Sequence, residues 1–376
     1  MDSKPTSIRD RLCQVAWSWY SMSMATGGIA VLLYNTPHQF PGLNTIGKIF
    51  YIFNLVLFFA ISFCLAVRFL SRSSALTESF QDPDETHFVA TCPLALATII
   101  IGASSYGTEA CGPWLPVALR VVFWIYVAVA MLQAIVHNWY LYHAHMAHAQ
   151  PFAIVRLLPS FPAMLSGTIA SVLASNQPDD QAVTMIIGGT TLQGFGFTMC
   201  LFIYAEYFYR MNKDGLPPAA QRPAMFIAVG PWSFTALALI GLADAAVEKF
   251  PAGYLIASAS GDPVAVATGQ IALVLASLTA IFLWTLAFYC LCVAILSLVT
   301  PCRALGGDGG VAPMSIVYWS MVFPNTGFVM ATIKIGQVLQ SEAVLWVSSV
   351  LTVLQVAIWL GVGTATVWML VRRGHL

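Results

Sequence analysis

The sequence predicts an all-α membrane protein, in which ten transmembrane helices form five helical hairpins around a common axis. Three observations lead to this prediction. Of the 376 residues, 59% are hydrophobic and only 9% are charged, with a mean hydropathy of +0.78, whereas about 25% of the residues of a soluble domain are charged. Ten apolar stretches each approach or exceed the roughly 20 residues that cross a bilayer. A proline also recurs at mid-span in alternate stretches.

The expected spans leave no room for a soluble domain between them. Residues 1–376 therefore form a single ten-helix membrane domain, with short cytoplasmic tails at 1–13 and 373–376. The spans, in order, are residues 14–34, 46–70, 88–106, 114–142, 158–175, 182–209, 223–246, 264–299, 313–338 and 343–371.

The recurring prolines are Pro93, Pro162, Pro231 and Pro324, in the third, fifth, seventh and ninth spans. The first two intervals are both 69 residues and the third is 93 residues. A proline inside a helix frees a backbone carbonyl that needs a polar partner. Tolerated kinks are the competing interpretation, but the regular spacing favours a repeated hairpin with one bent helix.

Odd and even spans differ in composition. Odd spans are rich in Gly, Ser and Thr, as in residues 161–168, and even spans carry bulky side chains, as in residues 121–126. Small residues allow helices to approach closely or to line a narrow path, and bulky apolar surfaces suit lipid. We therefore expect an inner ring of odd helices and an outer ring of even helices.

The basic residues indicate the orientation in the membrane. With the N-terminus inside, the cytoplasmic segments contain twelve of them and the outer loops contain only Lys249, so both termini are expected in the cytoplasm. Because the basic residues are spread over separate short segments, nucleic-acid binding is not expected. The twelve are Lys4, Arg9, Arg11, Arg68, Arg72, Arg156, Arg210, Lys213, Arg222, Arg303, Arg372 and Arg373.

Three cations lie within or near the spans, toward the expected outer side: Lys48, Arg120 and Lys334. Charges inside a membrane are costly and often functional, and a positive outer vestibule would attract anions. The alternative is that these side chains reach the interface, with Glu109 or Glu342 as counter-ion.

Other titratable residues suggest further chemistry. Glu206 could carry a coupled proton, although an ion pair with Arg210 one turn later is the simpler interpretation. His143, His145 and His148 invite a metal interpretation, but no paired Cys or acid completes a site. We therefore expect no metal, no cofactor and no enzymatic activity, and keep a membrane enzyme with a His-bound metal as an alternative.

Neutral polar side chains on the odd spans could hydrogen-bond a passing carboxylate without trapping it, as transport requires. A bond back to the same helix is the competing interpretation for any single hydroxyl. The expected pathway residues are Thr26, Thr98, Ser166, Thr168, Ser233, Thr235, Asn325 and Thr326.

The most specific local signal is the segment 323–327, in which Phe323 directly precedes Pro324 and small or polar residues follow. If the ninth span is an inner helix, the ring of Phe323 could project into a lumen as a plug. An ordinary packed phenylalanine is the alternative.

Several stretches together resemble the tellurite-resistance/dicarboxylate transporter family, which includes bacterial tellurite-resistance proteins, plant slow anion channels, fungal malate permeases and yeast sulfite pumps. The resemblance covers about residues 14–372 and is nearest to the fungal malate/C4-dicarboxylate branch. Trp232, where that branch is expected to have a second proline, and the acidic loop 82–85 depart from the pattern. The matching stretches are residues 24–30, 36–40, 120–127, 165–171, 222–231 and 322–328.

The resemblance implies quasi-five-fold symmetry, an inner pore of odd helices, a homotrimer with one pore per subunit, and Phe323 as the gate. It also implies transport of C4-dicarboxylates such as malate across a fungal plasma membrane. An exporter or channel for another anion, such as sulfite or a specialised organic acid, is the alternative within the family. A structural or receptor-like bundle would carry no flux.

Overall fold

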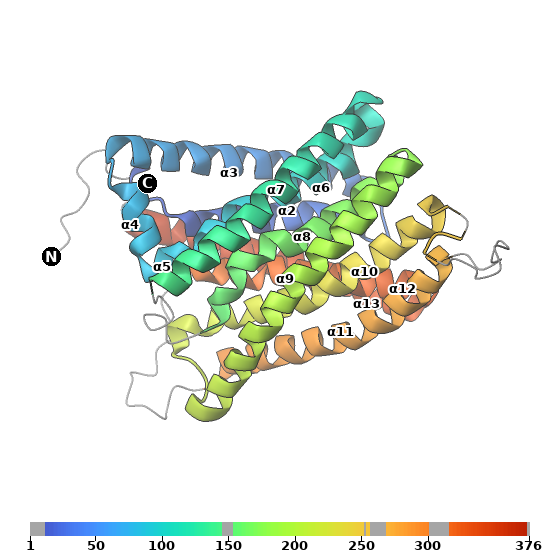
Figure 1. Ribbon diagram of the computed structural model, residues 1–376. Coiled ribbons are helices and arrows are strands. Elements are labelled where there is room, and N and C mark those ends of the chain that lie inside the picture. Colours follow the sequence, from blue (N-terminus) through green and yellow to red (C-terminus); the bar gives the residue numbers. More distant parts are fainter. Residues whose placement is uncertain (1–11, 145–152, 252, 256–267, 301–315, 374–376) are drawn as a thin grey trace.

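The computed structural model describes residues 12–144, 153–251, 253–255, 268–300 and 316–373, and every regular element within these ranges is helical (Figure 1). Nine helical segments there are long and apolar enough to cross a membrane. They confirm nine of the ten expected spans. The first expected span is present as α2 (Tyr20–Asn35), whose 16 residues fall short of the roughly 20 needed for a straight crossing.

The odd spans are composite. Each starts with a short 3₁₀ segment and continues as an α-helix. The pairs are η1 (Trp17–Trp19) with α2, η2 (His87–Ala90) with α6 (Thr91–Cys111), η4 (Ala153–Ser160) with α8 (Phe161–Leu173), η6 (Ala219–Ala228) with α10 (Val229–Lys249), and η7 (Ile316–Met321) with α12 (Phe323–Val338).

The four recurring prolines all lie in the first turn of the α-helical part, not in a helix interior. Pro162 and Pro324, for example, are the second residues of α8 and α12. In the first turn a missing N–H removes no helical hydrogen bond, so proline is well tolerated. The expectation of a helix bent around an internal proline is thus corrected: the break is a change of helix type.

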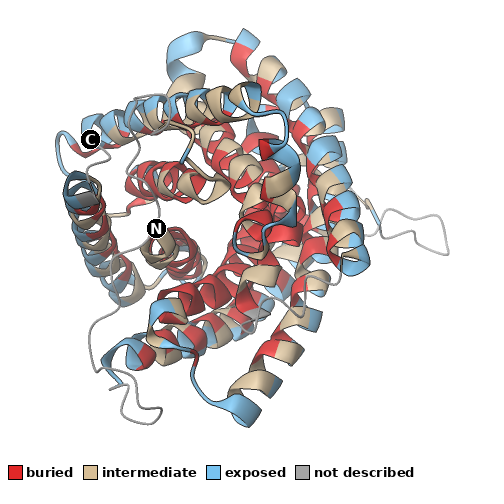
Figure 2. Ribbon diagram, turned by 90° about the vertical axis from the view of Figure 1, so that its left-hand side faces the viewer, coloured by how far each residue is buried: buried red, intermediate tan, exposed pale blue. Residues whose placement is uncertain are grey.

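The even spans are long continuous α-helices: α3 (Leu43–Ser71), α7 (Trp114–His143), α9 (Asp179–Asp214), α11 (Thr268–Val299) and α13 (Glu342–Arg373). The most apolar windows of the four odd spans among the nine are 56–94% buried, and those of the five even spans are 17–28% buried. Buried residues accordingly gather on the interior helices, with exposed ones around them (Figure 2).

The inner helices contact one another in cyclic order: α2 with α6, α6 with α8, α8 with α10, α10 with α12, and α12 with α2. Each outer helix contacts its own hairpin partner and the next inner helix, and α13 contacts both α12 and α2. The short helices α4 (Ala75–Gln81) and α5 (Pro83–Thr86) lie at the end of the bundle where α13 finishes (Figure 1).

A side chain on each outer helix also hydrogen-bonds the next inner helix, a regularity that the sequence did not reveal. Polar groups surrounded by apolar chains need such partners, so these bonds fix the two rings relative to each other. The pairs are Asn54 with Thr98 (α3 to α6), Tyr126 with the Pro162 carbonyl (α7 to α8), Gln193 with Thr235 (α9 to α10), Trp284 with Thr332 (α11 to α12), and Trp359 with Thr26 (α13 to α2).

Candidate functional site

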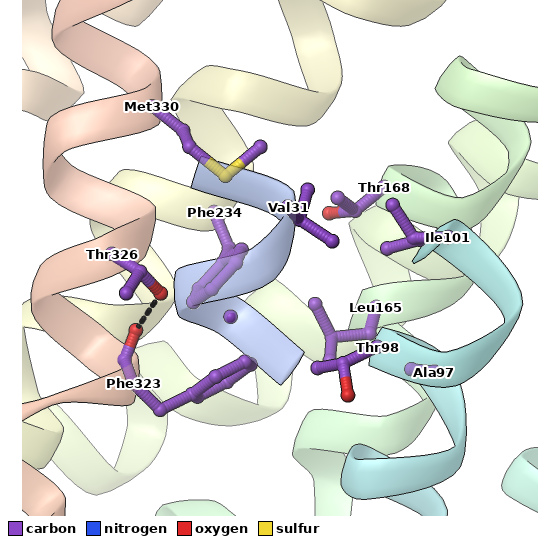
Figure 3. Close-up of a pocket in the computed structure, with 11 residues that line it drawn as sticks. Val31, Ala97, Thr98, Ile101, Leu165, Thr168, Phe234, Phe323, Thr326 and Met330 are labelled. Carbon is purple, nitrogen blue, oxygen red and sulfur yellow. Dashed lines mark hydrogen bonds between the residues drawn. The ribbon is translucent and has the colours of Figure 1, made fainter. Parts of the chain in front are cut away.

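A small cavity lies at the centre of the inner ring, and all five inner helices contribute to its lining (Figure 3). Its volume is about 20 Å³, which is room for about one water molecule. A C4-dicarboxylate is several times larger than water. The cavity is therefore too small to hold such a molecule in this structure.

Aromatic rings pack together beside the cavity, and those of Phe323 and Phe234 line it. Phe323 is only 2% exposed, and its ring stacks on that of Phe234, with ring centroids 4.8 Å apart and planes inclined by 23°. Phe161 meets the pair edge-on, with centroids 6.3 Å from Phe323 and 5.8 Å from Phe234. Sequence reasoning singled out Phe323 alone. The available signal for Phe161 was its place directly before Pro162, which matches the place of Phe323 before Pro324.

Each of these rings lies over a glycine of the next inner helix, and the glycine makes room for it. A β-carbon on any of these glycines would lie within 3.2 Å of a ring atom. This is closer than the ordinary contact distance of about 3.5–4.0 Å between carbon atoms. The small residues of the odd spans thus serve close ring packing at the centre. The pairs are Phe161 over Gly230, Phe234 over Gly327 and Phe323 over Gly28.

Three of the expected pathway residues line the cavity: Thr98, Thr168 and Thr326. The Thr326 hydroxyl donates to the Phe323 carbonyl at 2.6 Å (Figure 3), and the Thr98 hydroxyl donates to the Ala95 carbonyl at 2.8 Å. The Thr168 hydroxyl is buried without a hydrogen-bond partner in the protein. It is therefore the lining hydroxyl most available to a ligand.

The other five expected pathway residues are buried but do not line the cavity. The Thr26 hydroxyl accepts from Trp359, and the Thr235 hydroxyl accepts from Gln193, so both face outer helices. Ser233 donates to the Val229 carbonyl of its own helix, as the competing interpretation expected, and Asn325 donates to the Met321 carbonyl at the end of η7. The Ser166 hydroxyl has no partner in the protein.

None of the three expected anion-attracting cations lines the cavity. Lys48 is exposed on α3, and Arg120 and Lys334 are partly buried on α7 and α12. An Arg120 guanidinium nitrogen lies 3.5 Å from the Gln177 side-chain oxygen. All three lie toward the end of the bundle opposite to α4 and α5.

Glu206 forms two ion pairs near the end of α9. One is the expected pair with Arg210 at 2.8 Å, and the other joins it to Arg156 of η4. Arg156 was counted only as a cytoplasmic charge in the sequence, because a partner 50 residues away leaves no spacing signal. Glu206 therefore connects an outer helix to the start of an inner span.

The remaining features single out no further site. His143 ends α7, whereas His145, His148 and the glycine-rich segment 306–310 lie outside the described residues. Trp232 stacks on Tyr204 of α9 with centroids 4.7 Å apart. It does not line the cavity. The acidic segment 82–85, expected as a loop, belongs mostly to the short helix α5. Its Glu85 is buried and forms a two-point ion pair with Arg68, with N–O distances of 2.6 and 2.9 Å.

Comparison with known proteins places these features in context. The sequence model of the voltage-dependent anion channel family matches residues 14–367. A malic acid transport protein of Schizosaccharomyces pombe is 34% identical over 338 residues, covering 89% of this chain and 74% of that protein. A putative malic acid transport protein of the same organism is 34% identical over 354 residues, covering 94% and 79%. A sulfite efflux pump of Trichophyton rubrum is 24% identical over 351 residues, covering 93% and 89%.

Proposed function

Because this chain belongs to the voltage-dependent anion channel family, we propose that it transports C4-dicarboxylates such as malate through a central pore gated by Phe323. The observation that carries the proposal is the cavity lined by all five inner helices and closed by the ring of Phe323. The two malic acid transport proteins at 34% identity support the choice of substrate.

The proposed architecture is a ten-helix bundle with quasi-five-fold symmetry, in which α2 is the tenth span. Three regularities support it: the cyclic contacts among the inner helices, the repeated 3₁₀-to-α transition, and the hydrogen bond from each outer helix to the next inner one. Under this proposal α2, although it is shorter, is equivalent by the quasi-symmetry to the other four inner helices.

The proposed mechanism has three steps. Lys48, Arg120 and Lys334 raise the local anion concentration at the outer mouth. The hydroxyls of Thr98 and Thr168 replace part of the hydration shell of the anion in the narrow region. The ring of Phe323 blocks the path until it rotates or α12 shifts. Moving one elementary charge across the membrane changes its free energy by about 2.3 kcal/mol per 100 mV, so the protonation state of the substrate sets how strongly the membrane potential acts on the flux.

We further propose a homotrimer in the plasma membrane with both termini in the cytoplasm. The distribution of basic residues supports the orientation. The outer helices expose large apolar side chains along their lengths, which suits contact with lipid and with neighbouring subunits.

The test is flux of labelled malate into proteoliposomes under imposed pH and voltage gradients. Purified protein is expected to carry malate above empty liposomes, and Phe323→Ala is expected to increase the flux because it removes the ring that closes the cavity. A Phe323→Ala protein that folds normally and carries malate at the wild-type rate would remove the gating role. Absence of malate flux in both proteins would remove the proposed substrate.

Sulfite export is the second candidate, and the sulfite efflux pumps at 24% identity favour it. Sulfite is smaller than malate, so the narrow cavity would exclude it less. Parallel measurements with labelled sulfite distinguish the two: flux of sulfite without flux of malate would replace the first proposal by the second.

A further inference from the structure

The backbone next to Phe323, the proposed gate, is contacted by a side chain of an outer helix. The backbone breaks directly before Phe323, where η7 ends at Met321 and α12 begins. The residue between them, Val322, is fully buried. Its carbonyl belongs to the peptide bond that carries the Phe323 nitrogen, so the orientation of this peptide sets the direction in which the ring leaves the backbone.

Gln355 of the outer helix α13 hydrogen-bonds this carbonyl. Its side-chain nitrogen donates to the Val322 oxygen at 2.9 Å, and the same oxygen accepts the Thr326 backbone N–H at 3.0 Å. Gln355 is only 3% exposed, although α13 as a span is mostly exposed. A side-chain amide buried at membrane depth is costly without a hydrogen-bond partner. The bond to the Val322 carbonyl is what makes the burial of Gln355 tolerable.

Within the described part of the chain, other side-chain hydrogen bonds near this junction act on η7. On the η7 side, Trp319 donates to Thr366 of α13 at 3.1 Å and Ser320 donates to the Pro223 carbonyl at 2.6 Å. These bonds anchor η7 but lie before the break. Gln355, by contrast, donates to a carbonyl at the junction itself.

Resting on the proposed gating by Phe323, we infer that Gln355 is a positioning residue for the plug: its amide holds the Val322–Phe323 peptide in the orientation that keeps the ring in the path. Opening the path by turning this peptide or displacing α12 breaks the bond. The bond therefore favours the closed state, and its loss raises the open population. The same helix α13 also donates to Thr26 of α2 through Trp359. A movement of α13 would therefore act on α2 through Trp359 and on the backbone at Phe323 through Gln355.

The test compares Gln355→Met with a matched control, Thr352→Val. Methionine keeps the length and volume of glutamine but cannot donate a hydrogen bond. Thr352 lies one turn earlier on α13, is 4% exposed and donates only to its own helix, at the Ser348 carbonyl. We expect Gln355→Met to raise malate flux about two- to tenfold, the effect of one hydrogen bond, and Thr352→Val to leave it unchanged.

Each substitution is repeated in the Phe323→Ala background. If Gln355 acts through the ring, Gln355→Met changes nothing once the ring is absent, a non-additivity that a merely structural role would not produce. Gln355→Leu serves as a second variant, because its side chain has similar bulk and no hydrogen-bond donor. Flux equal to wild type in folded Gln355→Met and Gln355→Leu proteins overturns the inference, as does an equal increase with and without Phe323.

These outcomes separate the inference from the proposal on which it depends. If Phe323→Ala itself leaves the flux unchanged, the gating proposal fails. If Phe323→Ala raises the flux and the Gln355 variants do not, gating by Phe323 stands and only the positioning role of Gln355 is lost.

Discussion

At the scale of single residues, two hydroxyls on α8 offer a test of what the cavity does. Thr168 and Ser166 are both buried without a hydrogen-bond partner in the protein. Only Thr168 lines the cavity. They lie two positions apart on one helix and so point to nearly opposite sides. The pair therefore separates a role in the anion path from a role in packing.

We predict that Thr168→Val lowers malate flux about tenfold, because one hydrogen bond to a charged group contributes about 1.5 kcal/mol. Ser166→Ala should leave the flux unchanged. Neither substitution should lower the thermal midpoint in detergent, since each removes an unpaired buried polar group. Transport is measured in proteoliposomes, and the thermal midpoint is measured by unfolding in detergent. Equal malate flux in the wild-type, Thr168→Val and Ser166→Ala proteins would place Thr168 outside the path.

The residue scale also shows what sequence reasoning could and could not predict. It placed Phe323, Thr98 and Thr168 on inner helices, because composition separates odd spans from even ones. It could not predict that the hydroxyls of Thr26 and Thr235 face outer helices, since their partners are distant in the sequence. Rotation of a helix about its axis is set by such contacts, and a helix that is apolar all round gives no periodic signal for it.

At the scale of helices, close packing between hairpin partners depends on particular glycines. Gly196 of α9 faces the backbone of α8: a β-carbon there would lie 2.6 Å from the Met164 β-carbon and 2.7 Å from its nitrogen. A β-carbon on Gly194 of the same helix would meet no atom within 4 Å. The two glycines differ in surroundings but not in helix propensity.

We predict that Gly196→Ala destabilises the protein by about 1–3 kcal/mol, because the backbone of α8 must move to relieve the overlap. Gly194→Ala should be neutral or slightly stabilising, since alanine is favoured over glycine in a helix by roughly 1 kcal/mol. Thermal midpoints in detergent test the pair. Equal midpoints for the two variants would show that the helices do not pack this closely.

The helix scale also shows why the prolines were interpreted only in part. Their spacing predicted a repeated break in the odd spans, and the breaks are present. Hydropathy carries no information on whether a break is a bend or a change of helix type, because both keep the same residues in the membrane. The prolines lie in the first turns of α6, α8, α10 and α12, where their fixed backbone angle suits a helix start.

At the scale of the whole molecule, two helices from opposite ends of the chain meet. α13 contacts α2, and Trp359 donates to Thr26 at 3.1 Å across 333 positions of sequence. Nine of the ten expected spans were predictable from length and hydropathy, since the bilayer fixes the length of each helix. The order of contacts around the ring was not, because every helix offers a similar apolar surface and only specific polar pairs and small residues select its neighbours.

Orientation in the membrane provides the final prediction. Cys111 ends α6 and is exposed, and under the proposed orientation, which rests on the distribution of basic residues, this end of the bundle faces the outside of the cell. A membrane-impermeant maleimide applied to intact cells should therefore label the wild-type protein, and Cys111→Ser should abolish the labelling. Cys13, near the opposite end of the bundle, should react only after permeabilisation.

Labelling that survives in the Cys111→Ser protein on intact cells, or wild-type labelling that requires permeabilisation, would reverse the orientation. The end of the bundle that carries Lys48, Arg120 and Lys334 would then face the cytoplasm, and the proposed attraction of anions would favour export.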